Sequence, residues 1–200
     1  MGQIIIAVGR EFGSGGHILA QKLAEHYHIP LYNKELLTEV AKDGEYSKEV
    51  LERFDEKPMN LAFIPVPVGG TTVSLEQGVA ISQFNFLRKK ANEEKESFVV
   101  VGRCAEEMLA DNPNMVSIFV LGNKECKMKR VMEREGLDEK AALNKMKKVD
   151  KLRKTYHNFY CEVKWGDSRG YDLCINTSRV DIDTAVNMII QYIDSKQKNK

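Results

Sequence analysis

The stretch Gly9-Arg10-Glu11-Phe12-Gly13-Ser14-Gly15-Gly16-His17 decides the fold of this 200-residue chain. The residues directly before it, Ile4-Ile5-Ile6-Ala7-Val8, form a continuous apolar run, which is typical of a strand buried on both faces of a parallel sheet. Residues 17–27, directly after it, have the apolar spacing of an amphipathic helix, with one stripe made of Leu19, Leu23 and Tyr27. The sequence therefore predicts a strand, a glycine-rich turn and a helix in immediate succession.

A glycine-rich turn between a strand and a helix is suited to binding a phosphate. Backbone N–H groups and the helix start surround an anion there, and glycines let the backbone approach it because no Cβ is in the way. A tight turn without a ligand is the alternative, but three glycines within four residues exceed what a turn requires. His17 either donates to the phosphate or only caps the turn. We expect phosphate binding by Gly13, Ser14, Gly15, Gly16 and His17.

The turn departs from the standard P-loop pattern G-x-x-x-x-G-K-[S/T] at three points. Gly9 and Gly15 are separated by five residues rather than four. Gly16 stands where the Lys would be, and Ile18 falls where a Mg²⁺-binding Ser or Thr is expected. Phosphate binding tolerates these changes, but the Lys normally offsets charge that develops on the transferred phosphoryl group, so another cation must replace it.

The rest of the chain alternates between predicted strands and helices. Further strands are expected at 29–32, 98–101, 116–121 and 171–177. Further helices are expected at 34–42, 47–54, 74–94, 104–109, 124–135, 138–160 and 181–195, with a loop or edge segment at 58–70. This alternation predicts parallel pairing through crossover helices, hence one three-layer α/β/α domain over residues 1–200. Such sheets bind ligands beyond the carboxyl ends of their strands.

The composition excludes several classes of protein. Lys and Arg number 30 against 29 Asp and Glu, and a net charge of +1 creates no field that would favour nucleic acid or an anionic membrane. We expect no signal peptide and no membrane span, because the apolar runs are too short. Four scattered cysteines without a C-x-x-C pair argue against a zinc site or a disulfide framework and favour reduced thiols in a cytoplasmic protein. No feature indicates an oligomeric state.

Several strings along the chain resemble the cytidylate-kinase-like family. They are Arg10 to Gly16, Leu23-Ala24-Glu25, Pro30 to Leu36, Val101-Gly102-Arg103, Trp165-Gly166-Asp167 and Tyr171 to Ser178. The resemblance implies a P-loop NTPase fold of the nucleoside monophosphate kinase type, with an acceptor-binding region at 33–73 and a mobile lid at 138–167. It further implies ATP and Mg²⁺ as cofactors. The missing Lys is a trait of this family.

The resemblance also suggests roles for individual residues. Arg103 corresponds to an arginine that binds the monophosphate acceptor, although Cys104 replaces the usual Asp; a surface ion pair is the alternative. Arg130 and Arg134, four residues apart, would lie next to the lid over the donor phosphates, or else form an exposed basic face. Arg10, Lys22 or the lid arginines are candidates to replace the missing Lys.

The basic segment 147–156 is the other part of the predicted site. Asp150 and Arg153 lie three residues apart on the predicted helix, and their spacing resembles the pair that contacts cytosine and phosphate in cytidylate kinases. Tyr156 and Tyr160 could stack on a base. A solvated helix face is the alternative. The resulting catalytic set is Arg10, Arg130, Arg134 and Arg153, the acceptor set is Arg103, Asp150, Arg153 and Tyr156, and no residue is assigned to a metal.

Three functions fit the sequence. The first is phosphoryl transfer from ATP to a nucleoside monophosphate, CMP or dCMP by resemblance. The second is a nucleotide-binding regulatory protein that has lost transfer. The third is a kinase of another small hydroxylated or phosphorylated metabolite. Small-molecule nucleotides are thus the expected partners, and the neutral net charge disfavours nucleic acid.

Overall fold

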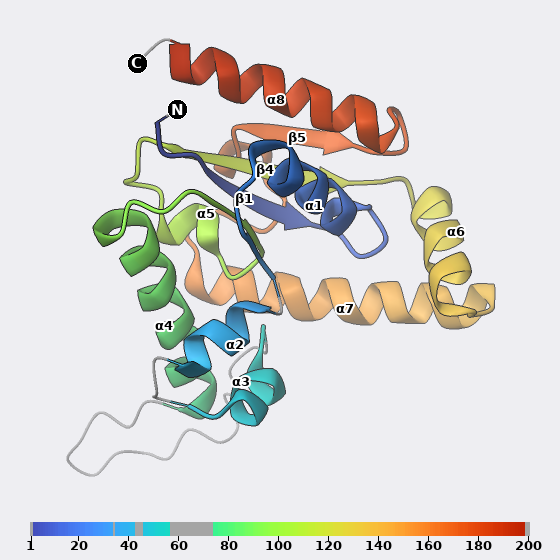
Figure 1. The fold of residues 1–200 in the computed structure, drawn as a ribbon. Helices are drawn as coiled ribbons and strands as arrows, with labels where there is room; N and C mark the ends of the chain where they lie inside the picture. The colour runs from blue at the N-terminus through green and yellow to red at the C-terminus, as the bar shows by residue number, and fades with distance from the viewer. Residues whose placement is uncertain (1, 34, 43–45, 57–73, 199–200) are drawn as a thin grey trace.

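One parallel sheet forms the centre of the molecule (Figure 1). The computed structural model describes residues 2–33, 35–42, 46–56 and 74–198. Within these residues the sheet has five strands in the order β2-β3-β1-β4-β5, and every neighbouring pair is parallel. The strands are β1 (Ile5–Arg10), β2 (Leu31–Tyr32), β3 (Phe98–Val101), β4 (Met115–Leu121) and β5 (Leu173–Asn176). The predicted α/β class with a parallel sheet is confirmed.

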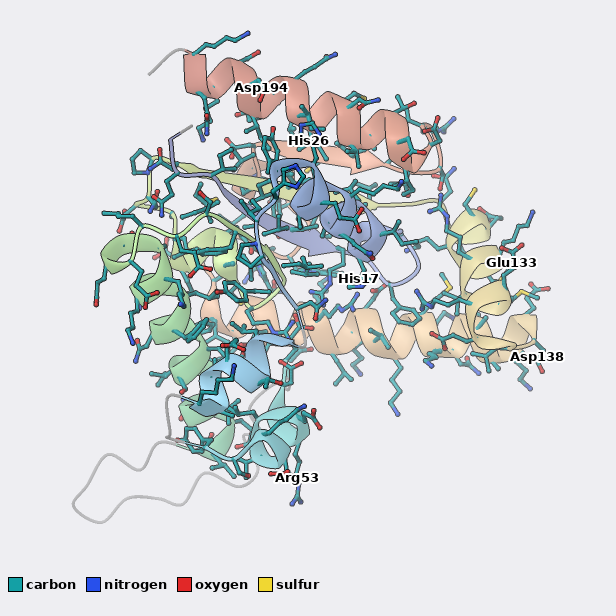
Figure 2. All side chains as sticks on the ribbon, viewed as in Figure 1. His17, His26, Arg53, Glu133, Asp138 and Asp194 are labelled. Carbon is teal, nitrogen blue, oxygen red and sulfur yellow. The ribbon has the colours of Figure 1, made fainter. Side chains whose placement is uncertain are left out.

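Helices connect the strands and cover both faces of the sheet. They are α1 (Gly16–Tyr27), α2 (Glu35–Lys42), α3 (Lys48–Phe54), α4 (Leu75–Arg88), α5 (Ala105–Met108), α6 (Lys124–Glu135), α7 (Glu139–Tyr160) and α8 (Ile182–Lys198). Helices α1 and α8 lie on one side of the sheet, and α2, α4, α5 and α7 lie on the other (Figure 1). His26 on α1 and Asp194 on α8 mark the first side, and Glu133 and Asp138 mark the corner where α6 turns into α7 (Figure 2).

The central strand β1 explains why two layers of helices are needed. Ile4, Ile6 and Val8 pack against α1 and α8, whereas Ile5 and Ala7 belong to the apolar cluster formed with α2, α4 and α5. Successive side chains of a strand point to opposite faces, so a continuous apolar run must be covered on both sides. The buried strand predicted from residues 4–8 is therefore the centre of two cores.

Some element boundaries differ from those predicted. The helix expected at 74–94 ends as an α-helix at Arg88 and continues as a π-helical turn, Lys89–Glu93. Its start is fixed by a capping box, in which the side chains of Ser74 and Gln77 each bond the other residue's backbone N–H. The expected loop at 58–70 and most of the second half of the acceptor-binding region predicted at 33–73 lie outside the described residues. In the part of the chain that is described, no helix is both long and apolar enough to cross a membrane.

Candidate functional site

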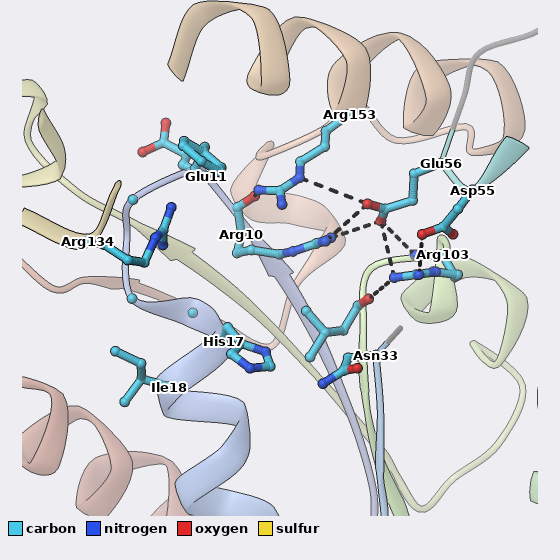
Figure 3. Close-up of a pocket in the computed structure, with 15 residues that line it drawn as sticks. Arg10, Glu11, His17, Ile18, Asn33, Asp55, Glu56, Arg103, Arg134 and Arg153 are labelled. Atoms are coloured by element: carbon cyan, nitrogen blue, oxygen red, sulfur yellow. Dashed lines mark hydrogen bonds and ion pairs between the residues drawn. The ribbon is translucent and has the colours of Figure 1, made fainter. Parts of the chain in front are cut away.

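A pocket of about 480 Å³ opens at the carboxyl ends of β1 and β3 (Figure 3). The glycine-rich turn forms one wall, and arginines and carboxylates from four other segments form the rest. The lining residues are Arg10, Glu11, Phe12, Gly13, Gly15, Gly16, His17, Ile18, Asn33, Asp55, Glu56, Val101, Arg103, Arg134 and Arg153. The pocket thus lies at the edge of the parallel sheet where the sequence predicts a ligand.

The glycine-rich turn leaves backbone N–H groups available at the start of α1. Ser14 is fully buried, and its N–H and hydroxyl both donate to the carbonyl of Glu11. Among the described residues, no protein acceptor is found for the N–H groups of Gly15, Gly16 and His17. A helix start with unpaired N–H groups is a ready anion site. Gly15 and His17 therefore fit the predicted phosphate role, whereas Ser14 acts inside the turn and does not line the pocket.

Side chains from α6 and α7 hold the turn in shape. The carboxylate of Asp150 accepts a hydrogen bond from the N–H of Phe12 at 2.7 Å. The carboxylate of Glu11 accepts from the N–H of Gly122 at 3.1 Å and from Lys127 Nζ at 2.8 Å. Asp150, predicted to contact the acceptor, lies outside the pocket because its oxygen is bound to the turn.

Arg130 supports the turn from behind. Its Nη1 donates to the carbonyl of Ser14 at 3.2 Å and to Thr177 Oγ1 at 2.9 Å, and its Nη2 donates to the carbonyl of Thr177 at 2.8 Å. The Thr177 hydroxyl itself donates to the Ser14 carbonyl at 2.6 Å. Arg130, predicted to be catalytic, does not line the pocket because its donors are used in joining the turn to the end of β5.

Two glycines of the turn are required by the space around them. Gly13 has φ +82°, and a Cβ there would lie 2.8 Å from the Lys127 carbonyl oxygen and from Val131 Cγ2. A Cβ at Gly16 would lie 2.7 Å from Arg10 Cβ. Gly16 occupies the position where a standard P-loop has its Lys, so the missing side chain makes room for the stem of Arg10. Lys22, another candidate to replace the Lys, pairs with Asp183 on the surface and does not line the pocket.

We expect Gly13→Ala to cost about 3 kcal/mol of unfolding free energy, because it combines a left-handed backbone with a collision against a backbone carbonyl. Gly136→Ala is the matched control, since Gly136 has φ +64° but nothing within 4 Å of the added Cβ. It is expected to cost about 1 kcal/mol. Urea unfolding of both variants measures the difference, and equal losses would show that the turn tolerates a Cβ at Gly13.

The wall opposite the turn is an ion cluster centred on Glu56 (Figure 3). Its carboxylate accepts from Arg10 Nη1 at 2.9 Å and Nη2 at 3.0 Å, and Arg153 Nε lies 4.0 Å away. Burial alone would raise the pKa of Glu56, but the guanidinium groups of Arg10 and Arg103 outweigh it and hold that pKa well below its usual range. Three guanidinium groups thus converge on one carboxylate and form an anion-binding site that Glu56 itself fills.

Arg103 belongs to the same cluster and is almost fully buried, with 3% of its surface exposed. Its Nη2 donates to Asp55 Oδ2 at 2.7 Å, and its Nη1 donates to the Val101 carbonyl at 2.9 Å. Its Nε has no partner among the described residues. The surface ion pair considered for Arg103 is therefore a buried one, and the residue lines the pocket as its predicted acceptor role requires.

Arg134 and Arg153 bring charge to the pocket from α6 and α7. The guanidinium carbon of Arg134 lies 4.9 Å from the centroid of the Phe12 ring, and that of Arg153 lies 5.8 Å from it. Burial is the main cause that lowers the pKa of Arg153, to about 10, and the positive charge of the nearby Arg10 is the second. This side chain is still charged at neutral pH. Both arginines are placed where a polyanion in the pocket would meet them.

The tyrosines predicted to stack on a base lie elsewhere. Tyr156 is buried in a cluster with Phe84, Cys104 and Cys161, and Tyr160 packs against the same cluster. Neither lines the pocket, because the end of α7 packs into the core instead of covering the ligand site. The predicted lid at 138–167 includes this buried end, so a closing movement would be confined to the first part of α7; lid closure stays a prediction.

The residues present do not form a ready Mg²⁺ site. Ile18, at the position of the usual Ser or Thr, offers no oxygen and is 52% exposed. The carboxylates of Glu11, Asp55 and Glu56 line the pocket, but each is paired with a Lys or Arg. In the described residues no group of three potential metal ligands is found.

The sequence did not reveal the roles of Asp55, Glu56, Phe12 and Lys127. Asp55 and Glu56 follow α3 as an ordinary pair of acidic residues, and only the fold brings them beside Arg10 and Arg103, which lie more than 40 positions away. The one indication in the sequence is that these two adjacent carboxylates lie within the acceptor-binding region predicted at 33–73.

Comparisons with known proteins identify the family. The sequence profile of the cytidylate kinase-like family matches residues 5–179. A cytidylate kinase from Methanocaldococcus jannaschii is 25% identical over 210 residues, which cover 98% of this chain and all of that protein. A crystal structure of an uncharacterized protein from Eubacterium ventriosum is 63% identical, with a TM-score of 0.78 over 96% of this chain and 99% of that one.

Solved structures of much lower identity share the fold alone. A shikimate kinase from Bacteroides thetaiotaomicron has a TM-score of 0.55 over 96% of this chain and 98% of its own, at 12% identity. Identity this low carries the architecture and not the substrate. The family profile, in contrast, covers the glycine-rich turn, the strand ends and the arginines of the pocket. The chain therefore belongs to the cytidylate kinase-like family.

Proposed function

We propose that this protein transfers the γ-phosphoryl group of ATP to a nucleoside monophosphate, with CMP or dCMP as the expected acceptor. One observation carries the proposal: the available N–H groups of the glycine-rich turn and the side chains of Arg10, Arg103, Arg134 and Arg153 line the same pocket. Phosphoryl transfer needs little covalent chemistry from the protein. It needs two phosphates held in line and cations around the charge that moves between them.

We assign a donor side and an acceptor side to the pocket. On the donor side, Gly15, Gly16 and His17 would hold the ATP phosphates, with Arg134 at the rim. On the acceptor side, Arg103 and Arg153 would bind the monophosphate. Arg10 is placed between them, because its stem packs on Gly16 and its guanidinium reaches Glu56. Arg10 therefore takes over the charge compensation that the Lys provides in a standard P-loop.

Glu56 sets the condition for acceptor binding. Its carboxylate fills the arginine cluster in the structure, so an acceptor phosphate must share or replace it. A phosphate brings more negative charge than a carboxylate and suits paired guanidinium groups better. An anionic acceptor is thus favoured over a neutral one. Mg²⁺ would enter with ATP, since this metal commonly binds substrate phosphates and keeps several waters.

A kinase of another small anionic metabolite is the second candidate. It is favoured by the position of Asp150 and Tyr156, the predicted contacts to a nucleotide base, because neither of them lines the pocket. The arginines would bind the phosphate of such a metabolite as well as they would bind that of a nucleotide. A cytoplasmic location belongs to either proposal, and it is supported by the four cysteines, all of which are free thiols.

A coupled assay of ADP release with ATP and Mg²⁺ tests the proposal against a panel of nucleoside monophosphates and small phosphorylated or hydroxylated metabolites. The proposed function predicts that CMP or dCMP gives the largest stimulation over the rate without acceptor. Stimulation by a non-nucleotide metabolite alone would favour the second candidate. Saturable ATP binding without acceptor-dependent ADP release across the panel would instead indicate a regulatory protein that has lost transfer.

A further inference from the structure

The aromatic ring of Phe12, in the glycine-rich turn, is a part of the pocket to which the proposed function gives no role. Phe12 lines the pocket together with the glycines that would hold a phosphate. Arg134 on α6 and Arg153 on α7 reach toward the same pocket (Figure 3). Both of their guanidinium groups lie over this one ring. A ring in such surroundings serves either the packing of the turn or the charges above it.

Phe12 is held in place by the two helices that carry these arginines. Its backbone N–H donates to Asp150 Oδ1 on α7 at 2.7 Å. Its side chain packs against a small apolar cluster formed where α6 meets α7, whose buried members are Val131, Ala142 and Met146. The backbone of Phe12 is therefore fixed to one helix, and its ring is fixed to both. Any group that rests on the face of this ring has a defined position in the pocket.

The distances from the ring are those of cation–π contacts. The guanidinium carbon of Arg134 lies 4.9 Å from the ring centroid of Phe12, and that of Arg153 lies 5.8 Å from it. A cation over the face of an aromatic ring, within about 6 Å of its centroid, is attracted by the negative face of the ring. Two like charges that converge on one point repel each other. The ring offsets part of that repulsion and keeps both guanidinium groups at the pocket.

An aromatic ring holds an arginine in a different way from a carboxylate. Arg10 gives both of its Nη atoms to the carboxylate of Glu56. Among the described residues, Arg153 has no carboxylate oxygen nearer than 4.0 Å, and its Nη1 donates to the Arg10 carbonyl only over 3.4 Å. Arg134 makes one close ion pair, from Nη2 to Glu135 Oε1 at 2.7 Å. Because the ring attracts the face of a guanidinium group, it leaves the N–H donors in the guanidinium plane to a phosphate.

We propose that Phe12 is a positioning residue, which holds Arg134 and Arg153 ready for the terminal phosphate of a triphosphate donor. The inference deepens the proposed function and rests on it, since Arg134 is assigned to the donor side and Arg153 to the acceptor side. The ring that both guanidinium groups share lies between these sides, where the transferred phosphoryl group would pass. Phe12 acts through the two arginines: it fixes where their charges stand and occupies none of their donors.

Calorimetry with inorganic triphosphate tests this inference, because that binding needs neither an acceptor nor transfer. Phe12→Leu and Phe12→Met each keep an apolar side chain for the cluster between α6 and α7 but remove the ring. We expect each to weaken triphosphate binding about fivefold or more, the effect of losing two cation–π contacts. Phe12→Tyr keeps the ring and should bind within about twofold of the unmodified chain. Phe159→Leu is the matched control: it removes a ring of α7 that is 43% exposed and lies outside the pocket, and it should leave binding unchanged.

A double-mutant cycle separates positioning from a general loss of shape. Arg134→Met removes the charge of a side chain that is 54% exposed and keeps an apolar stem. If Phe12 acts through Arg134, the loss caused by Phe12→Leu should be at least about twofold smaller in the Arg134→Met chain than in the unmodified one. Urea unfolding of every variant shows that folded proteins are compared. A role of Phe12 in packing alone would give the same loss in both chains.

Several results would overturn the inference. They are the absence of triphosphate binding by the unmodified chain, unchanged binding by the variants without the ring, an equal loss in Phe12→Tyr, and a loss in Phe12→Leu that does not depend on Arg134. Failure of the proposed function looks different. A chain that binds triphosphate with the expected dependence on Phe12, but transfers no phosphoryl group to any acceptor, would retain the inference about Phe12 and lose only the proposed transfer.

Discussion

Arg10→Ala is expected to lower kcat/KM for phosphoryl transfer by at least about 100-fold, the scale on which loss of one transition-state donor acts. Several residues that the structure describes are candidates to replace the P-loop Lys. Of these, Arg10 alone both packs on Gly16 and lines the pocket. Arg10→Lys keeps the charge but loses the two-pronged geometry, so a partial recovery is expected. Initial rates with ATP and the best acceptor measure all variants.

Lys22→Ala is the matched control for this experiment. Lys22 was an equal candidate in the sequence, but it pairs with Asp183 at the surface and lies outside the pocket. Its replacement should change kcat/KM by less than about twofold. Urea unfolding of the variants separates lost chemistry from lost structure. An Arg10→Ala protein that is folded and within threefold of the unmodified rate would reject Arg10 as the replacement for the Lys.

Glu56→Gln is expected to cost about 3 kcal/mol of unfolding free energy at pH 7, because it leaves three guanidinium groups without their central anion. Glu52→Gln is the matched control: Glu52 lies on α3 nearby, is exposed and makes only a long ion pair to Lys48. It should cost less than about 0.5 kcal/mol. Urea unfolding gives both values.

The stability lost in Glu56→Gln is also expected to depend on pH. Since the pKa of Glu56 is lowered in the folded state, its stabilisation is complete above the unfolded value, about 4.5, and is lost as the pH falls through the folded value. The difference in stability between the unmodified chain and Glu56→Gln should therefore be constant from pH 7 to 5 and shrink below about pH 4. A difference that grew with acidity would contradict the assigned shift.

Inorganic phosphate gives a further test of the arginine cluster. If Glu56 fills a site built for an anion, phosphate should raise the Tm of Glu56→Gln more than the Tm of the unmodified chain, because the variant leaves Arg10, Arg103 and Arg153 without their carboxylate. Chloride at the same ionic strength is the control. Equal shifts in both proteins would show that phosphate does not take the place of the carboxylate.

The sequence was sufficient for the fold because its local patterns agree with one another. The apolar run at 4–8 can be buried only between two helical layers, and the structure places it at the centre of the sheet. The glycines at 13, 15 and 16 could be assigned to a close approach of the backbone for the same reason. At Gly13, for example, φ is +82° and two atoms lie 2.8 Å from the place of an added Cβ, so a residue with a side chain fits poorly there.

The site was harder to predict because it depends on which partner each charged side chain finds. Nothing in the sequence distinguishes the roles of Arg10, Arg130 and Arg153. In the structure, Arg130 donates hydrogen bonds to the carbonyls of Ser14 and Thr177. Arg10 and Arg153 instead form ion pairs with Glu56. Tyr156 was assigned to a base because it lies on a basic helix. The face of α7 that carries it packs into the core, and only tertiary packing decides that outcome.

The most direct test of the proposed phosphoryl transfer follows the label from [γ-³²P]ATP into product, with CMP as acceptor and the products separated by chromatography. The proposed function predicts labelled CDP from the unmodified chain, formed on the order of once per second or faster, and at least about 100-fold less from Arg10→Ala. Label that appears only as inorganic phosphate, or remains in ATP under conditions of saturated binding with every monophosphate, would contradict it.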